Sequence, residues 1–135
     1  MASSPLRPPA VPSPIVVLLV EPDDDSRSMY AQYLQACGFT VQTADTTDEG
    51  VTHAREADVI VVGILMPGSF DGVELVRRLR GANETTEAPI IVLTACALPA
   101  DRQRALAAGC DVFLPKPCLP DDLVSEIRAL WPVIA

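Results

Sequence analysis

The chain has 135 residues, of which 49% are hydrophobic and 21% are charged, a composition typical of one globular domain with a buried core. Its net charge of −8 argues against nucleic-acid binding, which needs clustered Lys and Arg. No apolar run approaches the ~20 residues of a membrane span, and prolines at residues 5–14 interrupt any signal-peptide core. We therefore expect a cytoplasmic protein without membrane contact.

The chain divides into a short tail and one folded domain. Residues 1–14 are rich in Pro and Ser and have no hydrophobic periodicity, which predicts a flexible tail ahead of a domain over residues 15–135. Short apolar runs bounded by turn residues predict strands at residues 15–20, 59–62, 89–95 and 112–114, and a further short strand is expected at residues 39–44.

Capping signals and helical periodicity predict helices between these strands. The first helix begins at the acids of residues 23–25 and ends at Gly38, and its apolar stripe is formed by Met29, Tyr30, Tyr33, Leu34 and Cys37. The pattern Thr46-x-x-Glu49 predicts a capping box for a second helix that ends near Glu56. The third and fourth helices are predicted to begin at Asp71 and Pro99. The last helix begins at Pro120, and its inner stripe is formed by Leu123, Val124, Ile127, Leu130 and Trp131.

Two groups of residues receive structural interpretations. The four cysteines show no C-x-x-C spacing and the chain has one His, so no zinc site is expected and the cysteines are interpreted as small buried hydrophobes. The basic cluster Arg77, Arg78 and Arg80 falls on the predicted third helix and is interpreted as a solvated face.

Five alternations of strand and helix predict an α/β fold, a doubly wound five-stranded parallel sheet with helices on both faces. The flavodoxin-like strand order 2-1-3-4-5 fits a chain of this length. In such a sheet the carboxyl ends of four strands meet at one edge, which is the usual place for a functional site. The residues expected there are Glu21, Pro22, Asp23, Gly63, Thr94 and Lys116.

The segments VVLLVEPDDDSR, DVIVVGILMPGSFDGVELVRRLR, PIIVLTA and AAGCDVFLPKPCLPDDL carry a family resemblance. In this order they resemble the receiver domain of bacterial two-component response regulators, over residues 15–131. The resemblance implies an Asp at the end of the third strand that takes a phosphoryl group from a histidine kinase, and two acids after the first strand that help to hold Mg²⁺. It also implies a hydroxyl residue at Thr94, an aromatic switch position at Phe113, and a phosphoryl-contacting Lys116 that is often followed by a cis peptide bond.

The sequence departs from this pattern at two positions. The MPG sequence at residues 66–68 fixes the register and places Gly63, and not Asp58 or Asp71, at the phosphoacceptor position. Pro22 occupies the second acid position and offers no carboxylate. Because Mg²⁺ needs protein carboxylates and a phosphate, we expect no cofactor, with at most weak residual metal binding at Glu21 and Asp23.

The remaining pocket residues then receive other roles. We expect Lys116 to form an ion pair with Glu21 or Asp23, Thr94 to bond the backbone of a loop, and Phe113 to stay buried without acting as a switch. Helix capping is the default role of Asp23 and its acidic neighbours.

These features favour a pseudo-receiver of phosphorelay signalling, which is not an enzyme and acts by protein–protein contact. Its partner would be a histidine kinase, a phosphotransfer protein or another regulator, bound at the first helix, or a second copy bound through the fourth helix, fifth strand and fifth helix. The alternative is an active receiver that accepts the phosphoryl group on another residue: Asp23, Ser69 or Asp71. A weaker possibility is an anion site at Lys116.

Overall fold

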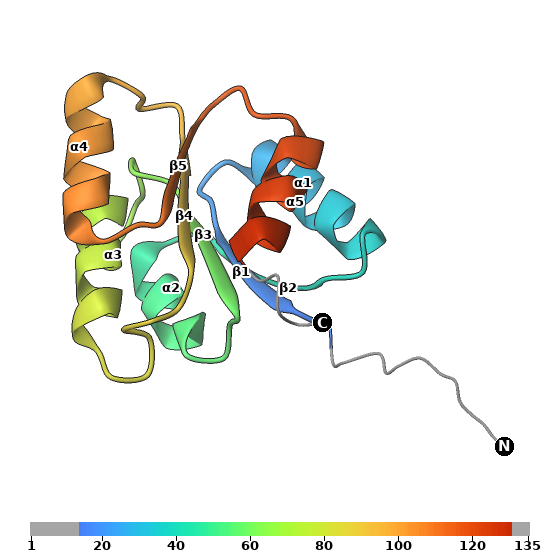
Figure 1. Ribbon diagram of the computed structural model, residues 1–135, viewed down its shortest axis with the longest axis horizontal. Helices are drawn as coiled ribbons and strands as arrows, with labels where there is room; N and C mark the ends of the chain where they lie inside the picture. Colours follow the sequence, from blue (N-terminus) through green and yellow to red (C-terminus); the bar gives the residue numbers. More distant parts are fainter. Residues whose placement is uncertain (1–13, 131–135) are drawn as a thin grey trace, which may run out of the picture.

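The computed structural model describes residues 14–130 and contains one parallel sheet (Figure 1). Its strand order is β2-β1-β3-β4-β5, as predicted, and each neighbouring pair is parallel. The strands are β1 (Val16–Val20), β2 (Thr40–Ala44), β3 (Val59–Val62), β4 (Ile90–Thr94) and β5 (Val112–Pro115). The predicted tail lies outside the described residues except for Pro14.

Five helices cover the two faces of the sheet. They are α1 (Asp24–Ala36), α2 (Thr47–Ala54), α3 (Gly72–Gly81), α4 (Pro99–Ala108) and α5 (Pro120–Leu130). Helices α1 and α5 pack on one face, and α2, α3 and α4 pack on the other (Figure 1). None of the helices within residues 14–130 is long and apolar enough to cross a membrane.

Alternate residues of the strands fill two hydrophobic cores, one on each face. Leu18, Ile60 and Val92 face α2, α3 and α4, whereas Leu19 and Val61 face α1 and α5. Strand side chains alternate between faces, so a strand that is apolar at every position is buried on both sides. The continuous apolar runs of the sequence therefore correctly predict the central strands.

Three helix details differ from the sequence predictions. Met29 is 43% exposed and Ala31 is buried, whereas the other four predicted members of the inner stripe of α1 do pack against the core. Helix α2 ends two residues before Glu56, because the following turn continues with bonds between residues three apart. Only half of the predicted capping box forms: the Thr46 hydroxyl accepts from the Glu49 N–H at 3.1 Å, whereas the Glu49 carboxylate bonds the N–H of Asp45 at 3.4 Å.

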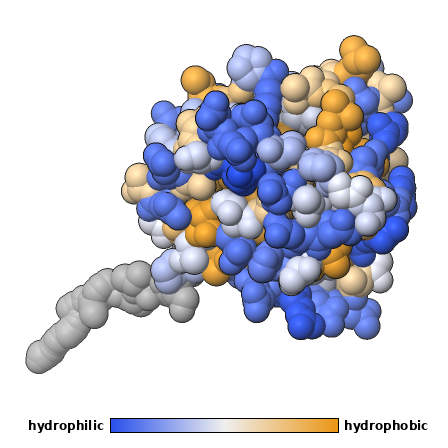
Figure 2. Space-filling model, turned by 180° about the vertical axis from the view of Figure 1, so that it is seen from behind, coloured by the Kyte–Doolittle hydropathy of each residue, from blue (hydrophilic) through white to orange (hydrophobic). Residues whose placement is uncertain are grey.

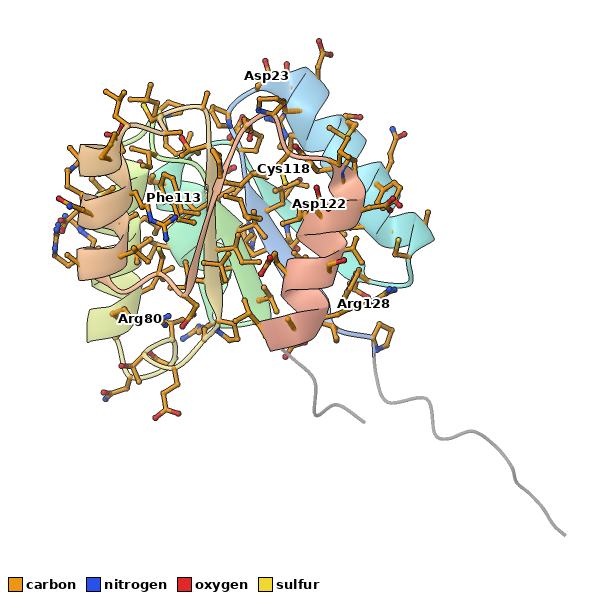
Figure 3. The ribbon with its side chains drawn as sticks, turned by 45° about the horizontal axis from the view of Figure 1, so that its top comes forward. Asp23, Arg80, Phe113, Cys118, Asp122 and Arg128 are labelled. Atoms are coloured by element: carbon orange, nitrogen blue, oxygen red, sulfur yellow. The ribbon has the colours of Figure 1, made fainter. Side chains whose placement is uncertain are left out.

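The interpretation of Arg80 as part of a solvated face is wrong. Its guanidinium donates to the carbonyl oxygens of Ala88 at 2.6 Å and Gly109 at 2.9 Å, and to the Asp111 carboxylate at 2.9 Å. Gly109 has φ +117°, and a Cβ there would lie 2.7 Å from Arg80 Cγ. Arg80 thus joins α3 to the segments that precede β4 and β5, at the end of the sheet opposite Asp23 (Figure 3). Its neighbour Arg78 is on the surface, as predicted, and pairs with Glu74.

The cysteines are only partly the buried hydrophobes that the sequence suggests. Cys110 is buried, and burial raises the pKa of its thiol to about 11. Cys37, Cys96 and Cys118 are half-buried. Trp131, expected on the inner stripe of α5, lies outside the described residues.

Candidate functional site

The carboxyl ends of β1, β3, β4 and β5 surround a small cavity at the edge of the sheet that is uppermost in Figure 1. Its volume is about 150 Å³. Five of the six residues that the sequence places at this edge line it, and Asp23 does not. The lining residues used below are Glu21, Pro22, Gly63, Thr94, Cys96 and Lys116.

Gly63 follows β3 directly and contributes only backbone to the cavity. Its N–H donates to the Val20 carbonyl oxygen at 3.2 Å, which continues the pairing of β3 with β1. A Cβ added at Gly63 would lie 3.6 Å from both the Leu93 carbonyl oxygen and Met66 Sδ, which is ordinary contact. Neither backbone conformation nor packing therefore requires glycine at this position.

Gly72 differs from Gly63 in this respect. A Cβ at Gly72 would lie 1.7 Å from the carbonyl oxygen of Gly63, an impossible distance. The Gly72 N–H donates to the Ile64 carbonyl oxygen at 2.9 Å, so the start of α3 approaches the end of β3 closely. Position 72 therefore requires glycine, whereas position 63 could hold a larger residue.

Glu21 and Lys116 form an ion pair inside the cavity. The Lys116 Nζ lies 2.7 Å from Glu21 Oε1, and the other carboxylate oxygen accepts from the Asp23 N–H at 3.0 Å. The Glu21 side chain is 4% exposed and that of Lys116 is 21% exposed. The pair predicted for Lys116 is therefore present, with Glu21 and not Asp23 as the partner, and both oxygens of Glu21 are occupied.

Asp23 caps α1 and does not line the cavity. Its Oδ2 accepts from the Ser26 N–H at 2.8 Å, and this backbone hydrogen bond is the main reason that the pKa of the Asp23 carboxyl lies below its ordinary value. Figure 3 shows Asp23 at the start of α1. The default interpretation of Asp23 as a helix cap is therefore confirmed.

The side chains of the cavity do not fit a Mg²⁺ ion in this arrangement. Magnesium takes oxygen ligands in near-octahedral geometry and is usually held by one or two carboxylates. Glu21 is committed to Lys116 and a backbone N–H, while Pro22 and Gly63 offer no side-chain oxygen. Within residues 14–130, no three His, Cys, Asp or Glu side chains form a group that could hold a metal ion. Weak or lost magnesium binding stays a prediction.

Thr94 and Phe113 have the environments that the sequence predicts. The Thr94 hydroxyl is buried and accepts from the backbone N–H groups of Cys96 at 3.0 Å and Ile64 at 3.4 Å. Phe113 is 8% exposed and lies between the sheet and α4 (Figure 3). The Lys116–Pro117 peptide bond is cis, as the resemblance implies.

The alternative phosphoryl acceptors have structural contacts elsewhere. Ser69 bonds the Asp48 carboxylate through its N–H at 3.0 Å and its hydroxyl at 3.3 Å. Asp71 caps α3 through the Glu74 N–H at 2.9 Å and pairs with Arg104 at 3.2 Å. Neither residue lines the cavity that contains Lys116 and Thr94.

Sequence reasoning missed the apolar character of this edge. Leu65, Leu98 and Leu119 are 71%, 70% and 68% exposed, and they lie in the loops that follow β3, β4 and β5. Cys96 also lines the cavity. The only sequence signal for the three exposed side chains is a leucine in each loop, and a leucine by itself does not show whether its side chain is buried or exposed.

The strand order and the positions around the cavity define a receiver-type signalling domain. The model of the response regulator receiver domain matches residues 17–128, and the chain belongs to this family of two-component signalling domains. A curated relative, the phosphate regulon transcriptional regulatory protein PhoB of Rhizobium meliloti, is 35% identical over 116 residues, which are 84% of this chain and 51% of that protein. The chain thus spans about half the length of the curated relatives it matches.

Solved structures agree with the fold. The chemotaxis protein CheY4 of Vibrio cholerae is 30% identical with a TM-score of 0.80, over 87% of this chain and 98% of that one. The receiver domain of the sensor histidine kinase PA1611 of Pseudomonas aeruginosa is 28% identical with a TM-score of 0.80, over 87% and 97%. That structure holds a magnesium ion in its active-site cleft.

Proposed function

We propose that this receiver domain is a pseudo-receiver, which is not phosphorylated at the usual position and signals by binding other proteins. The observation that carries the proposal is Gly63 at the end of β3, where the family resemblance implies a phosphoaccepting Asp. A phosphoryl group needs a nucleophilic side chain there, and a hydrogen atom cannot form the bond. The domain would then have no enzymatic role.

The ion pair between Glu21 and Lys116 supports this proposal. The amine that would bind phosphoryl oxygens instead contacts a carboxylate at 2.7 Å, and that carboxylate is the first of the two expected metal ligands. The Lys116 ammonium and the Glu21 carboxylate thus neutralise each other's charge. The site is neutral and hydrogen-bonded without a phosphoryl group or a metal ion.

The geometry disfavours the alternative, an active receiver that uses Asp23, Ser69 or Asp71. An acceptor must approach within about 3 Å of a phosphoryl site that Lys116 and Thr94 also reach. All three candidates are engaged with backbone or side-chain partners outside the cavity.

The proposed partners are a histidine kinase, a phosphotransfer protein or another regulator in the cytoplasm. One candidate surface is α1 with the loop of residues 21–25, where Asp24 and Asp25 are exposed. The other is the face of α4, β5 and α5, through which a second copy would bind. On that face Arg102 is exposed and Leu106 is 41% exposed, whereas Arg104 is already paired with Asp71 and Asp101.

Treatment with acetyl phosphate and Mg²⁺, followed by intact-mass spectrometry, tests this proposal. Titration with beryllofluoride and Mg²⁺, monitored by amide NMR, is an independent measurement. We expect no phosphoryl adduct and no saturable shifts around Gly63. A stable adduct on any aspartate or serine would refute the proposal, and its mapped position would identify the acceptor.

A further inference from the structure

The exposed hydrophobic residues of the described chain are concentrated at the edge that carries the cavity. Six large hydrophobic side chains within residues 14–130 are exposed, and the three most exposed are Leu65, Leu98 and Leu119, here called the leucine rim. The other three are only 41–46% exposed. Each rim residue follows one of three neighbouring strands, β3, β4 and β5. Figure 2 shows hydrophobic side chains at the upper edge, on the side where α4 lies in that view.

The cavity beside the rim has no free charge to offer a ligand. The charges of Glu21 and Lys116 cancel at 2.7 Å, and the Thr94 hydroxyl already accepts two backbone N–H groups. The rest of the lining includes Pro22, Gly63 and Leu93, which are apolar or lack a side chain. The volume of about 150 Å³ leaves room for one apolar side chain beside these residues.

Acidic residues lie on one side of this edge, at the starts of the two helices that share a face of the sheet. Asp23 and Asp25 lie at the start of α1, and Asp121 and Asp122 lie at the start of α5, directly after Leu119. Within residues 14–130 none of these four forms a salt bridge, although Asp121 accepts a hydrogen bond from Tyr33. The charge complement of these acids is therefore basic.

We propose that the leucine rim and the cavity form a docking site for a protein segment that presents an uncharged apolar side chain flanked by Lys or Arg. The apolar side chain would enter the cavity beside Gly63, and the flanking cations would face the acids at the starts of α1 and α5. Clustered exposed apolar residues within a polar border are typical of such contact sites. This inference rests on the proposed function, because an unphosphorylated Gly63 site leaves the cavity open.

NMR titration of the isotope-labelled full chain with three synthetic peptides tests the site. The peptides carry arginines on both sides of a central Leu, Ala or Glu and are otherwise identical. We expect the Leu peptide to shift the amides of Gly63, Leu65 and Cys96 and to bind about tenfold more tightly than the other two, since burial of one Leu side chain provides at least that factor.

Two variants connect binding to the proposed residues. The triple variant Leu65→Ser, Leu98→Ser and Leu119→Ser should weaken binding of the Leu peptide about tenfold. These residues are exposed, so the variant should fold, and circular dichroism checks this. The control Val51→Ser removes an exposed apolar side chain from α2, outside both candidate surfaces, and should leave binding unchanged.

Equal affinity for the three peptides would overturn the inference, because binding would then be electrostatic only. Absence of binding would also overturn it, as would shifts confined to α2 and α3. These titrations contain no phosphoryl donor and no Mg²⁺, so their failure leaves the proposed function standing. A phosphoryl adduct in the acetyl phosphate experiment would remove both.

Discussion

Replacement of Lys116 by Met tests the ion pair at the centre of the site. Met has a similar length and no charge, so the variant leaves the Glu21 carboxylate buried without its cation. The Glu21 side chain is 4% exposed, and the lost contact is 2.7 Å long. An uncompensated buried charge costs about 3–5 kcal/mol. Because Lys116 is 21% exposed and the Asp23 N–H still bonds Glu21, we expect a loss of about 2–4 kcal/mol.

Urea unfolding followed by circular dichroism measures this loss in the full chain. The matched control is the double variant Lys116→Met with Glu21→Gln, which removes the orphaned charge along with its partner. We expect the double variant to be more stable than Lys116→Met alone, because a neutral amide keeps the bond from the Asp23 N–H without a buried charge. A loss below about 1 kcal/mol in the single variant would refute the reasoning, since the pair would then behave like a surface salt bridge.

Three further predictions concern the acceptor position, the opposite end of the sheet and the cap of α1. Gly63→Asp alone should accept little phosphoryl group from acetyl phosphate, because Pro22 still supplies no carboxylate for Mg²⁺. Gly63→Asp with Pro22→Asp should accept more, as measured by mass spectrometry. Equal labelling of the two variants would show that Pro22 does not limit phosphorylation. Arg80→Ala should lower the free energy of unfolding by about 2–4 kcal/mol. Arg80→Lys should recover less than half of this loss, because an ammonium group lacks the planar set of N–H donors that reaches several oxygens at once. Full recovery of stability by Lys would contradict this explanation. The pKa of Asp23 is lower in the folded chain than in the unfolded chain, so its carboxylate stabilises the fold at a pH above the unfolded pKa. This contribution is lost as the pH falls through the folded pKa. Asp23→Asn, which keeps a capping oxygen, should therefore lose less stability than the natural chain on acidification below pH 3.8, and an unchanged acid profile would count against it.

The sequence determined the strands, the helices and the two unusual positions of the site. Continuous β-branched and apolar runs such as Val59–Val62 are local signals, and a strand without polar positions requires burial on both faces. The caps at Thr46 and Asp71 are local in the same sense, since each bonds an N–H three residues later. The absence of a carboxylate at Gly63 and Pro22 is a matter of residue identity alone.

Only the tertiary structure decided which distant groups meet. Lys116 pairs with Glu21, 95 residues away, because β1 and β5 end at the same edge of the sheet. Arg80 likewise connects distant segments, since its partners come from the segments before β4 and β5. The exposure of Leu65 likewise depends on the path of the loop that follows β3. Side-chain partners and exposure are set by packing between segments far apart in the chain, whereas strand and helix patterns are set by neighbours along it.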